Sequence, residues 1–275
     1  MLRNRVFLAG SFLAVLLLAG GVIAQRQWRQ LYDRRGVPDW KVDEAMKHDV
    51  FTFVRVEYDS FAYGRHGGGW RTDWPDSDLN FSYRLQQLTS LKVNPEPLIL
   101  RLTDEKLFDY PFLYLIEPGR MTLHDDEVKA LRRYCFNGGF LMVDDFWGSD
   151  EYDNFYHEIK RVFPDREPEE LPLEHPVFHC VYDLKEKPQI PAINAAWEGR
   201  AQGITWEWRP GEDTSVAYYK GIFDDDGRMM VIICHNTDLG DGWEREGEDQ
   251  WYFREFSEKK AYPLGINIVT YAMTH

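Results

Sequence analysis

The sequence contains few cysteines. Only Cys135, Cys180 and Cys234 occur in 275 residues, and an odd number does not make a closed disulfide framework. Cys135 lies in a helix-like pattern and Cys234 in a strand-like pattern, so we expect both to be buried as small hydrophobic residues. A Cys180–Cys234 disulfide is the alternative that an oxidising compartment would allow.

A surplus of basic residues is missing as well. The chain has 32 Lys and Arg against 46 Asp and Glu, which gives a net charge of -14. A nucleic-acid-binding surface needs a basic face, and we find only short pairs such as Arg132–Arg133. The composition therefore argues against a nucleic-acid partner and predicts a solvated acidic surface.

The usual motif of an activated serine or cysteine nucleophile is absent. There is no Gly-x-Ser-x-Gly sequence, and Phe146-Trp147-Gly148 stands where such a nucleophile would follow the strand that ends at Val143. We therefore assign no catalytic residue from the sequence.

Short His and Cys spacings of the kind that bind zinc are also absent. We predict no cofactor and no metal. One alternative stays open, because the acidic stretch after His235 contains Asp238, Asp241 and Glu244, whose oxygens could bind calcium.

The N-terminus has the features of an export signal. Arg3 and Arg5 precede an apolar run from Val6 to Leu18, and small residues end at Ala24. Residues 1–24 are either a cleaved signal peptide or an uncleaved membrane anchor over residues 6–24, and both export the rest of the chain because the positive charges stay inside. We expect a polar tether at 25–49 and a single domain at 50–275.

The pattern of the domain predicts an α/β fold with a mostly parallel sheet flanked by helices. A strand at 112–116, a helix from Thr122 to Phe136 and a strand at 140–143 follow one another with short joints, which favours parallel pairing. Two strands around Asp224–Gly227 predict a β-hairpin in the C-terminal part. Further expected elements are strands at 50–56, 98–102 and 204–208, helices at 77–91, 149–163 and 263–273, and a long acidic loop at 237–250.

The strongest candidate for a site is the end of the strand at 140–143. Asp144, Asp145 and Trp147 follow it directly, and ligands of open α/β sheets bind beyond the carboxyl ends of the strands. Neighbouring side chains on a strand point to opposite faces. We therefore expect one carboxylate to be buried against backbone amides and the other to face the site.

Other candidates come from three loops. The loop WRTDWPDSDL at 70–79 offers Asp73, and Asp76 is expected to cap the next helix. Glycines 67–69 lack the offsets of a phosphate cradle and predict a flexible loop. The predicted ligand-binding residues are Asp73, Trp74, Asp144, Asp145, Trp147, His175, Asn236, Asp238 and Asp241.

Seven ordered motifs carry a family resemblance. They are W-x-T-D-W-P at 70–75, L-x-x-L-T at 85–89, L-x-D-Y-P-F-L-Y at 107–114, L-R-R-Y-x-x-N-G-G-F-L at 131–141, D-D-F-W-G at 144–148, H-P-V-F at 175–178 and N-T-D-L-G-D-G-W at 236–243. From about Phe51 to Met273 the chain resembles the bacterial family catalogued as domain of unknown function 4159. The resemblance implies a fold similar to class I glutamine amidotransferases, and envelope-associated partners of the von Willebrand and MoxR types. It implies no known reaction, and the Cys of the amidotransferase Cys–His pair is missing at the expected turn.

These patterns favour a binding role over catalysis. We expect a non-catalytic exported envelope protein that recognises a partner or a glycan through a cleft at the carboxyl ends of the strands. The alternative is a hydrolase acting on glycan or peptide, with Asp144 or Asp145 as general base and His175 as its partner.

Overall fold

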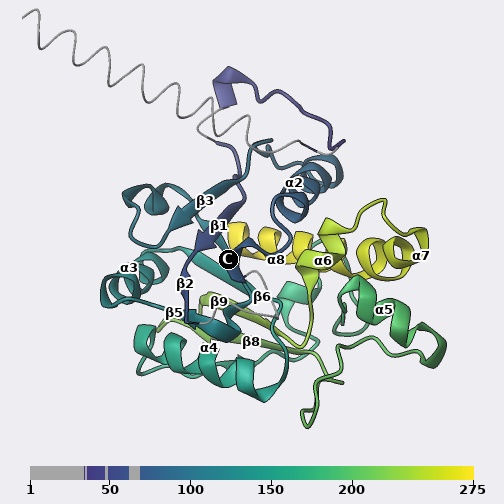
Figure 1. Ribbon diagram of the computed structural model, residues 1–275. Helices are drawn as coiled ribbons and strands as arrows, with labels where there is room; N and C mark the ends of the chain where they lie inside the picture. The colour runs from purple at the N-terminus through teal and green to yellow at the C-terminus, as the bar shows by residue number, and fades with distance from the viewer. Residues whose placement is uncertain (1–33, 35, 47–48, 62–68) are drawn as a thin grey trace, which may run out of the picture. The chain divides into compact units, whose positions relative to one another are not determined.

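The computed structural model describes residues 34, 36–46, 49–61 and 69–275 (Figure 1). The chain divides into two compact units, Met1–Pro38 and Asp39–His275, and the second carries the α/β domain. The expected signal or anchor at 1–24, part of the tether (residues 25–33, 35, 47 and 48), and glycines 67 and 68 lie outside the described residues. Among the helices that are described, none is both long and apolar enough to cross a bilayer.

A seven-stranded sheet organises the domain. Its strand order is β3-β1-β4-β6-β9-β8-β7. Strands β3, β1, β4, β6 and β9 are parallel, β8 pairs antiparallel with β9, and β7 pairs antiparallel with β8. A short antiparallel pair, β2 with β5, lies beside it. The strands are β1 (Val54–Glu57), β2 (Asp59–Ser60), β3 (Leu98–Arg101), β4 (Phe112–Ile116), β5 (Met121–Thr122), β6 (Phe140–Asp144), β7 (Glu169–Glu170), β8 (Tyr218–Phe223) and β9 (Met229–His235).

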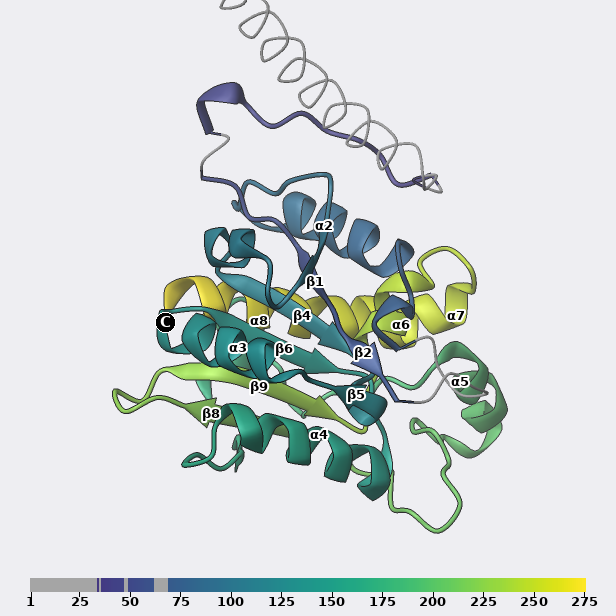
Figure 2. The ribbon, with the colours of Figure 1, turned by 60° about the vertical axis from the view of Figure 1, so that its left-hand side comes forward.

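Side chains alternate between two cores along the central strands. In β4, Phe112, Tyr114 and Ile116 point into one core while Leu113 and Leu115 point into the other. All five are buried, because helices cover both faces of a parallel sheet. Helices α2, α6 and α8 contribute to the first core and α3 and α4 to the second. Figure 2 shows α3 in front of the sheet and α8 behind it.

The helices begin and end close to clear sequence signals. In α3, acidic residues occupy the first turn, where they interact favourably with the helix dipole, and Gly138 has a left-handed backbone just beyond the end. The helices are α2 (Asp76–Leu88), α3 (Asp125–Phe136), α4 (Gly148–Val162), α5 (Ile193–Gly199), α6 (Leu239–Glu244), α7 (Gln250–Tyr252), a π-helix at Phe253–Ala261, and α8 (Tyr262–Thr274), with short 3₁₀ turns at Glu44–Met46, Gly69–Arg71, Glu105–Asp109, Pro118–Arg120, Pro176–Phe178 and Arg200–Gln202.

The structure confirms the predicted α/β class with a mostly parallel sheet and a C-terminal β-hairpin. Three local predictions are wrong. Asp76 is not the cap of α2, because it is the first residue of that helix and Pro75 has the N-cap position. Residues 204–208 form no strand. The expected acidic loop at 237–250 contains α6 and the start of α7. Asp238 explains the helix within the expected loop, because its side chain accepts a hydrogen bond from the Asp241 amide and caps α6.

The cysteines are free in the structure. Cys135 and Cys234 are fully buried, as expected of small hydrophobic residues, and Cys180 is partly buried. The Cys180–Cys234 disulfide does not form. Burial raises the pKa of the Cys135 thiol to about 12 and that of Cys234 well above its usual range, so neither supplies a thiolate nucleophile at neutral pH.

Candidate functional site

Three adjacent parallel strands end on polar residues with an unusual backbone. Glu117 follows β4, Asp145 follows β6 and Asn236 follows β9, with φ angles of 49°, 54° and 59°. A positive φ is uncommon for residues other than glycine and concentrates at functional sites. Because β4, β6 and β9 are neighbours that run in the same direction, these residues lie along one edge of the sheet.

The two adjacent aspartates after β6 have different environments, as the alternation of strand side chains predicted. Asp144 is fully buried, and its Oδ2 accepts hydrogen bonds from the Tyr114 hydroxyl at 3.0 Å and from the amides of Leu239 and Gly240 at 3.0 and 3.1 Å. Asp144 thus fastens the first turn of α6 to the sheet.

Asp145, unlike Asp144, contributes to the candidate site. Its Oδ1 accepts one hydrogen bond, from Trp147 Nε1 at 3.2 Å. Trp147 is only 1% exposed, so its indole holds Asp145 through this hydrogen bond and offers no surface to a ligand. The contact area expected from Trp147 is therefore not available in this structure.

Asp73 reaches the same edge from the loop before α2. The loop is held by Arg55 of β1, which is completely buried. Arg55 Nη1 donates to the carbonyl oxygens of Trp70 and Thr72 at 3.0 and 2.9 Å, and Arg55 Nε donates to Asp78 Oδ2 at 3.0 Å. Asp73 lies within this tied segment and also has a left-handed backbone, with φ of 62°.

Asp238 enters the site from the start of α6. Its Oδ1 accepts from the Asp241 amide at 2.7 Å. Asp241, by contrast, is already paired, because its Oδ2 accepts from the Ile193 amide at 2.5 Å and its Oδ1 from Arg245 Nε at 2.9 Å.

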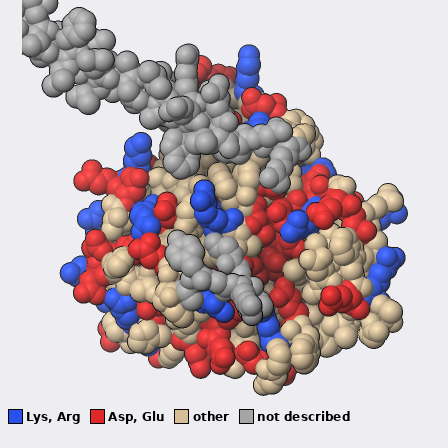
Figure 3. Space-filling model, viewed as in Figure 1, with Lys and Arg blue, Asp and Glu red and all other residues tan. Residues whose placement is uncertain are grey.

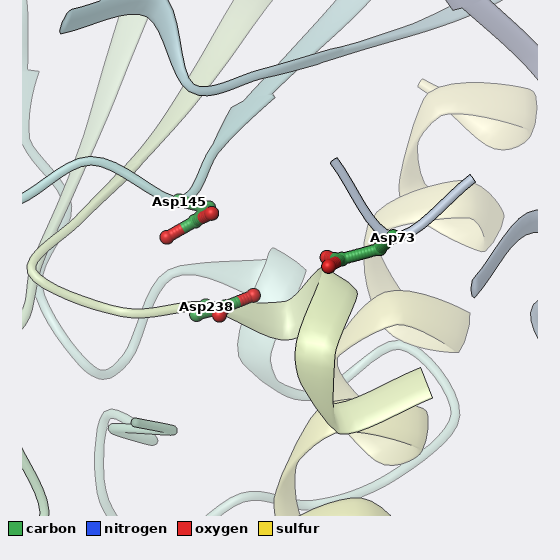
Figure 4. A group of neighbouring side chains, drawn as sticks. All are labelled: Asp73, Asp145 and Asp238. Carbon is green, nitrogen blue, oxygen red and sulfur yellow. The ribbon is translucent and has the colours of Figure 1, made fainter. Parts of the chain in front are cut away.

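Asp73, Asp145 and Asp238 converge. One carboxylate oxygen from each lies within 4.8 Å of the others, and Figure 4 shows the three side chains around one space, each from a different segment. We call these three residues the carboxylate triad. A second group with the same spacing contains Asp73, Asp241 and Glu244.

The electrostatics of the triad disfavour its charged form. Burial raises the pKa of each member well above its usual range, and neighbouring carboxylates raise it further. Burial also raises the pKa of Asp144, Glu117 and Glu244 to about 7 in each case. The edge of the sheet therefore holds several carboxylates whose negative charge the protein does not compensate.

Some residues of this edge were missed in the sequence. Glu117 and Glu207 raise the pKa values of triad members through their charge, and so does Glu244, which the sequence had named as a possible calcium ligand. Glu117 could have been found by its place one residue after a buried strand. Glu207 lies in an irregular stretch without such a signal, next to Trp208, whose side chain is 75% exposed.

His175 does not join the other predicted site residues. Its ring centroid lies 5.4 Å from that of Tyr271 and 6.4 Å from that of Phe223. Phe223 pairs with Met229 at the first residue of β9, so His175 lies at the opposite end of the sheet from Asp145. Its Nδ1 accepts from the Val177 amide, which gives the imidazole a local capping role.

Asn236 and Trp74 are the remaining predicted ligand-binding residues. Asn236 is fully buried, accepts from the Gly148 amide at 2.8 Å and donates to the Val216 carbonyl at 2.9 Å, so it joins the segments after β6 and β9. Trp74 is partly buried beside Asp73. Figure 3 shows Asp and Glu atoms gathered near the middle of this face, toward the region where α6 lies in Figure 1.

Comparison with known proteins places the chain in a family. None of the curated proteins compared with it matches. The family described as "Domain of unknown function (DUF4159)" matches residues 52–273, which is nearly the whole α/β domain. The chain therefore belongs to the DUF4159 family.

Proposed function

We propose that this protein is a non-catalytic binding domain of the bacterial envelope, and that its ligand site is the acidic edge around the carboxylate triad. The observation that supports this most is the convergence of Asp73, Asp145 and Asp238 within 4.8 Å from three separate segments. Uncompensated buried carboxylates destabilise a fold. Selection for binding would explain why Asp73, Asp145 and Asp238 are kept together.

The ligand would be a glycan or a partner protein that donates hydrogen bonds to these carboxylates. Trp208, 75% exposed and next to Glu207, would supply the flat apolar surface that Trp147 does not. The family resemblance adds proteins of the von Willebrand and MoxR types as partners to look for.

A hydrolase that uses Asp144 or Asp145 with His175 has less support. Asp144 Oδ2 accepts three hydrogen bonds that hold α6 and Tyr114. His175 contacts residues at the other end of the sheet. The proposed base and its partner therefore do not share a site.

Affinity capture from envelope extracts tests the binding role. The wild-type chain is compared with an Asp145→Asn/Asp238→Asn double variant, which keeps both acceptor oxygens, and with Asp226→Asn as a matched control. Asp226 is exposed in the turn between β8 and β9, far along the sheet from the triad. We expect wild type and control to recover the same glycan or protein and the double variant to recover at least tenfold less. Equal recovery by all three would show that the triad is not the binding surface.

Export is part of this proposal and rests on residues 1–24, where two arginines precede an apolar run. N-terminal sequencing of the protein from the periplasm should give Gln25 as the first residue if the signal is cleaved. An intact N-terminus with the protein in the membrane fraction would indicate the anchor. An intact N-terminus with the protein in the cytoplasm would contradict export.

A further inference from the structure

We propose that Asp73, Asp145 and Asp238 bind one divalent cation of the class that prefers oxygen ligands, such as Ca²⁺, Mg²⁺ or Mn²⁺. This inference rests on the proposed function, because it names what the same acidic edge holds. It differs from the calcium alternative of the sequence, which placed the ion on Asp238, Asp241 and Glu244.

The spacing of the triad suits such an ion. Two oxygens bound to one ion lie at most two bond lengths apart, which is about 4–5 Å for Mg²⁺ and Ca²⁺. The oxygens of Asp73, Asp145 and Asp238 already lie within 4.8 Å of one another. Three carboxylate ligands leave further coordination positions open, which water or oxygen atoms of a bound ligand would fill.

A buried oxygen without a partner is the second, independent observation. Asp73 Oδ2 is buried and accepts no hydrogen bond among the described residues. It lies against Gly240, where a Cβ atom would overlap it, and Figure 4 shows the Asp73 carboxylate directed toward Asp238. A buried acceptor without a partner destabilises the fold, and more so when it is charged. A cation between the three side chains would remove this penalty.

The distribution of positive charge selects the triad over the second acidic group. Arg245 forms ion pairs with Asp241 at 2.9 Å and with Glu244 at 2.8 Å, which partly neutralises that group. Across the described ranges, no lysine or arginine forms an ion pair with a triad member. Arg55 attracts Asp73 only at longer range. Its guanidinium forms an ion pair with Asp78 and donates hydrogen bonds to two loop carbonyl groups.

The loops that carry the triad are fixed without the ion. Arg55 ties the segment of Asp73, Trp147 supports Asp145, and the helix cap orients Asp238. A site whose ligands are already in place loses little conformational entropy on binding. We therefore expect the triad to bind the ion in the folded protein and to gain stability from it.

The test is a titration of the chelator-treated full-length protein with CaCl₂, MgCl₂ and MnCl₂ in turn, followed by calorimetry and by thermal unfolding. We expect saturable binding of one ion per chain for at least one salt, and a melting temperature that rises with its concentration. Asp73→Asn and Asp145→Asn should each weaken binding at least tenfold, while Asp226→Asn should not. Circular dichroism of each variant checks that it is folded.

Two results would overturn the inference: no saturable binding of any of the three ions to the wild-type protein, or unchanged affinity in both aspartate variants. Electron paramagnetic resonance of Mn²⁺ gives a second measurement, because bound Mn²⁺ loses its free-ion signal whatever the heat of binding. The capture experiment above, repeated with chelator, separates the two proposals. Recovery that depends on Asp145 and Asp238 but persists in chelator would leave the binding role standing and remove the cation.

Discussion

At the scale of single residues, each carboxylate at the acidic edge has a role set by its hydrogen bonds. Asp144 has three donors and supports structure, whereas Asp145 has one and belongs to the site. The sequence predicted this division because adjacent strand residues face opposite sides. It could not predict which of the two would accept hydrogen bonds from backbone amides, since that depends on the position of α6. Glu207 lay beyond prediction because only tertiary folding brings it near Asp145.

Glu117 gives a prediction about pH at this scale. Its Oε2 accepts from the Gly69 amide at 2.9 Å, and burial raises its pKa from 4.5 to about 7. An unfolded chain would ionise Glu117 near pH 4.5, while the folded chain keeps the proton until about pH 7. The stabilisation from this group is therefore complete below pH 4.5 and is lost as the pH rises to 7.

Replacing Glu117 with Gln removes this loss and keeps an acceptor for Gly69. The Glu117→Gln variant should gain stability relative to wild type as the pH rises from 5 to 8, by about 1–3 kcal/mol, since one pKa unit corresponds to about 1.4 kcal/mol. Thermal unfolding at both pH values measures this gain in stability. The control is Glu169→Gln, because Glu169 is exposed in β7, the last strand of the sheet. A difference that stays constant with pH, or that grows toward pH 5, would contradict the assignment.

At the scale of elements, the site depends on how loops are fastened to strand ends. The segment before α2 is held by Arg55 on β1, and α6 is held by Asp144 on β6. The sequence predicted the strands and long helices from hydrophobic spacing but missed α6. Its six residues include Gly240, Asp241 and Gly242, which all have low helix propensity. Two hydrogen bonds stabilise the start of α6, from the Gly240 amide to Asp144 and from the Asp241 amide to Asp238. Packing of Trp243 in the core stabilises the helix further.

Arg55 gives the prediction at this scale. Removing one partner of a buried ion pair leaves an uncompensated charge, which typically costs about 3–5 kcal/mol. Arg55→Ala should therefore lower the free energy of unfolding by about 3–5 kcal/mol, because Asp78 stays fully buried. Urea denaturation followed by circular dichroism measures this.

The matched control is Arg101→Ala on the neighbouring strand β3. Arg101 is partly exposed, and its ion pairs with Glu57 and Asp59 face solvent. Its third partner, the buried Glu127, lies 3.6 Å away and still accepts a hydrogen bond from the His124 amide when Arg101 is removed. Exposed pairs contribute about 0–1 kcal/mol, so the control should lose far less. Equal losses in the two variants would show that Arg55 does not fasten the loop.

At the scale of the whole molecule, several carboxylates with buried oxygens gather where the central strands end. The net charge of -14 indicated a solvated acidic surface, but it did not indicate that buried carboxylates would share one edge. The topology explains this, because neighbouring parallel strands β4, β6 and β9 bring their last residues to the same place. It also explains why His175 is absent, since its loop returns to the opposite end beside the start of β9.

The account's central claim is that the triad is kept for binding at a cost in stability. The most direct measurement is the melting temperature of the Asp145→Asn/Asp238→Asn variant against wild type, in chelator at pH 8 and without ligand. Asparagine keeps the acceptor for Trp147 and the helix cap but removes the buried charge. We predict that the variant melts a few degrees higher than wild type. A variant that melts lower would show that the carboxylates are structural, and would contradict the claim.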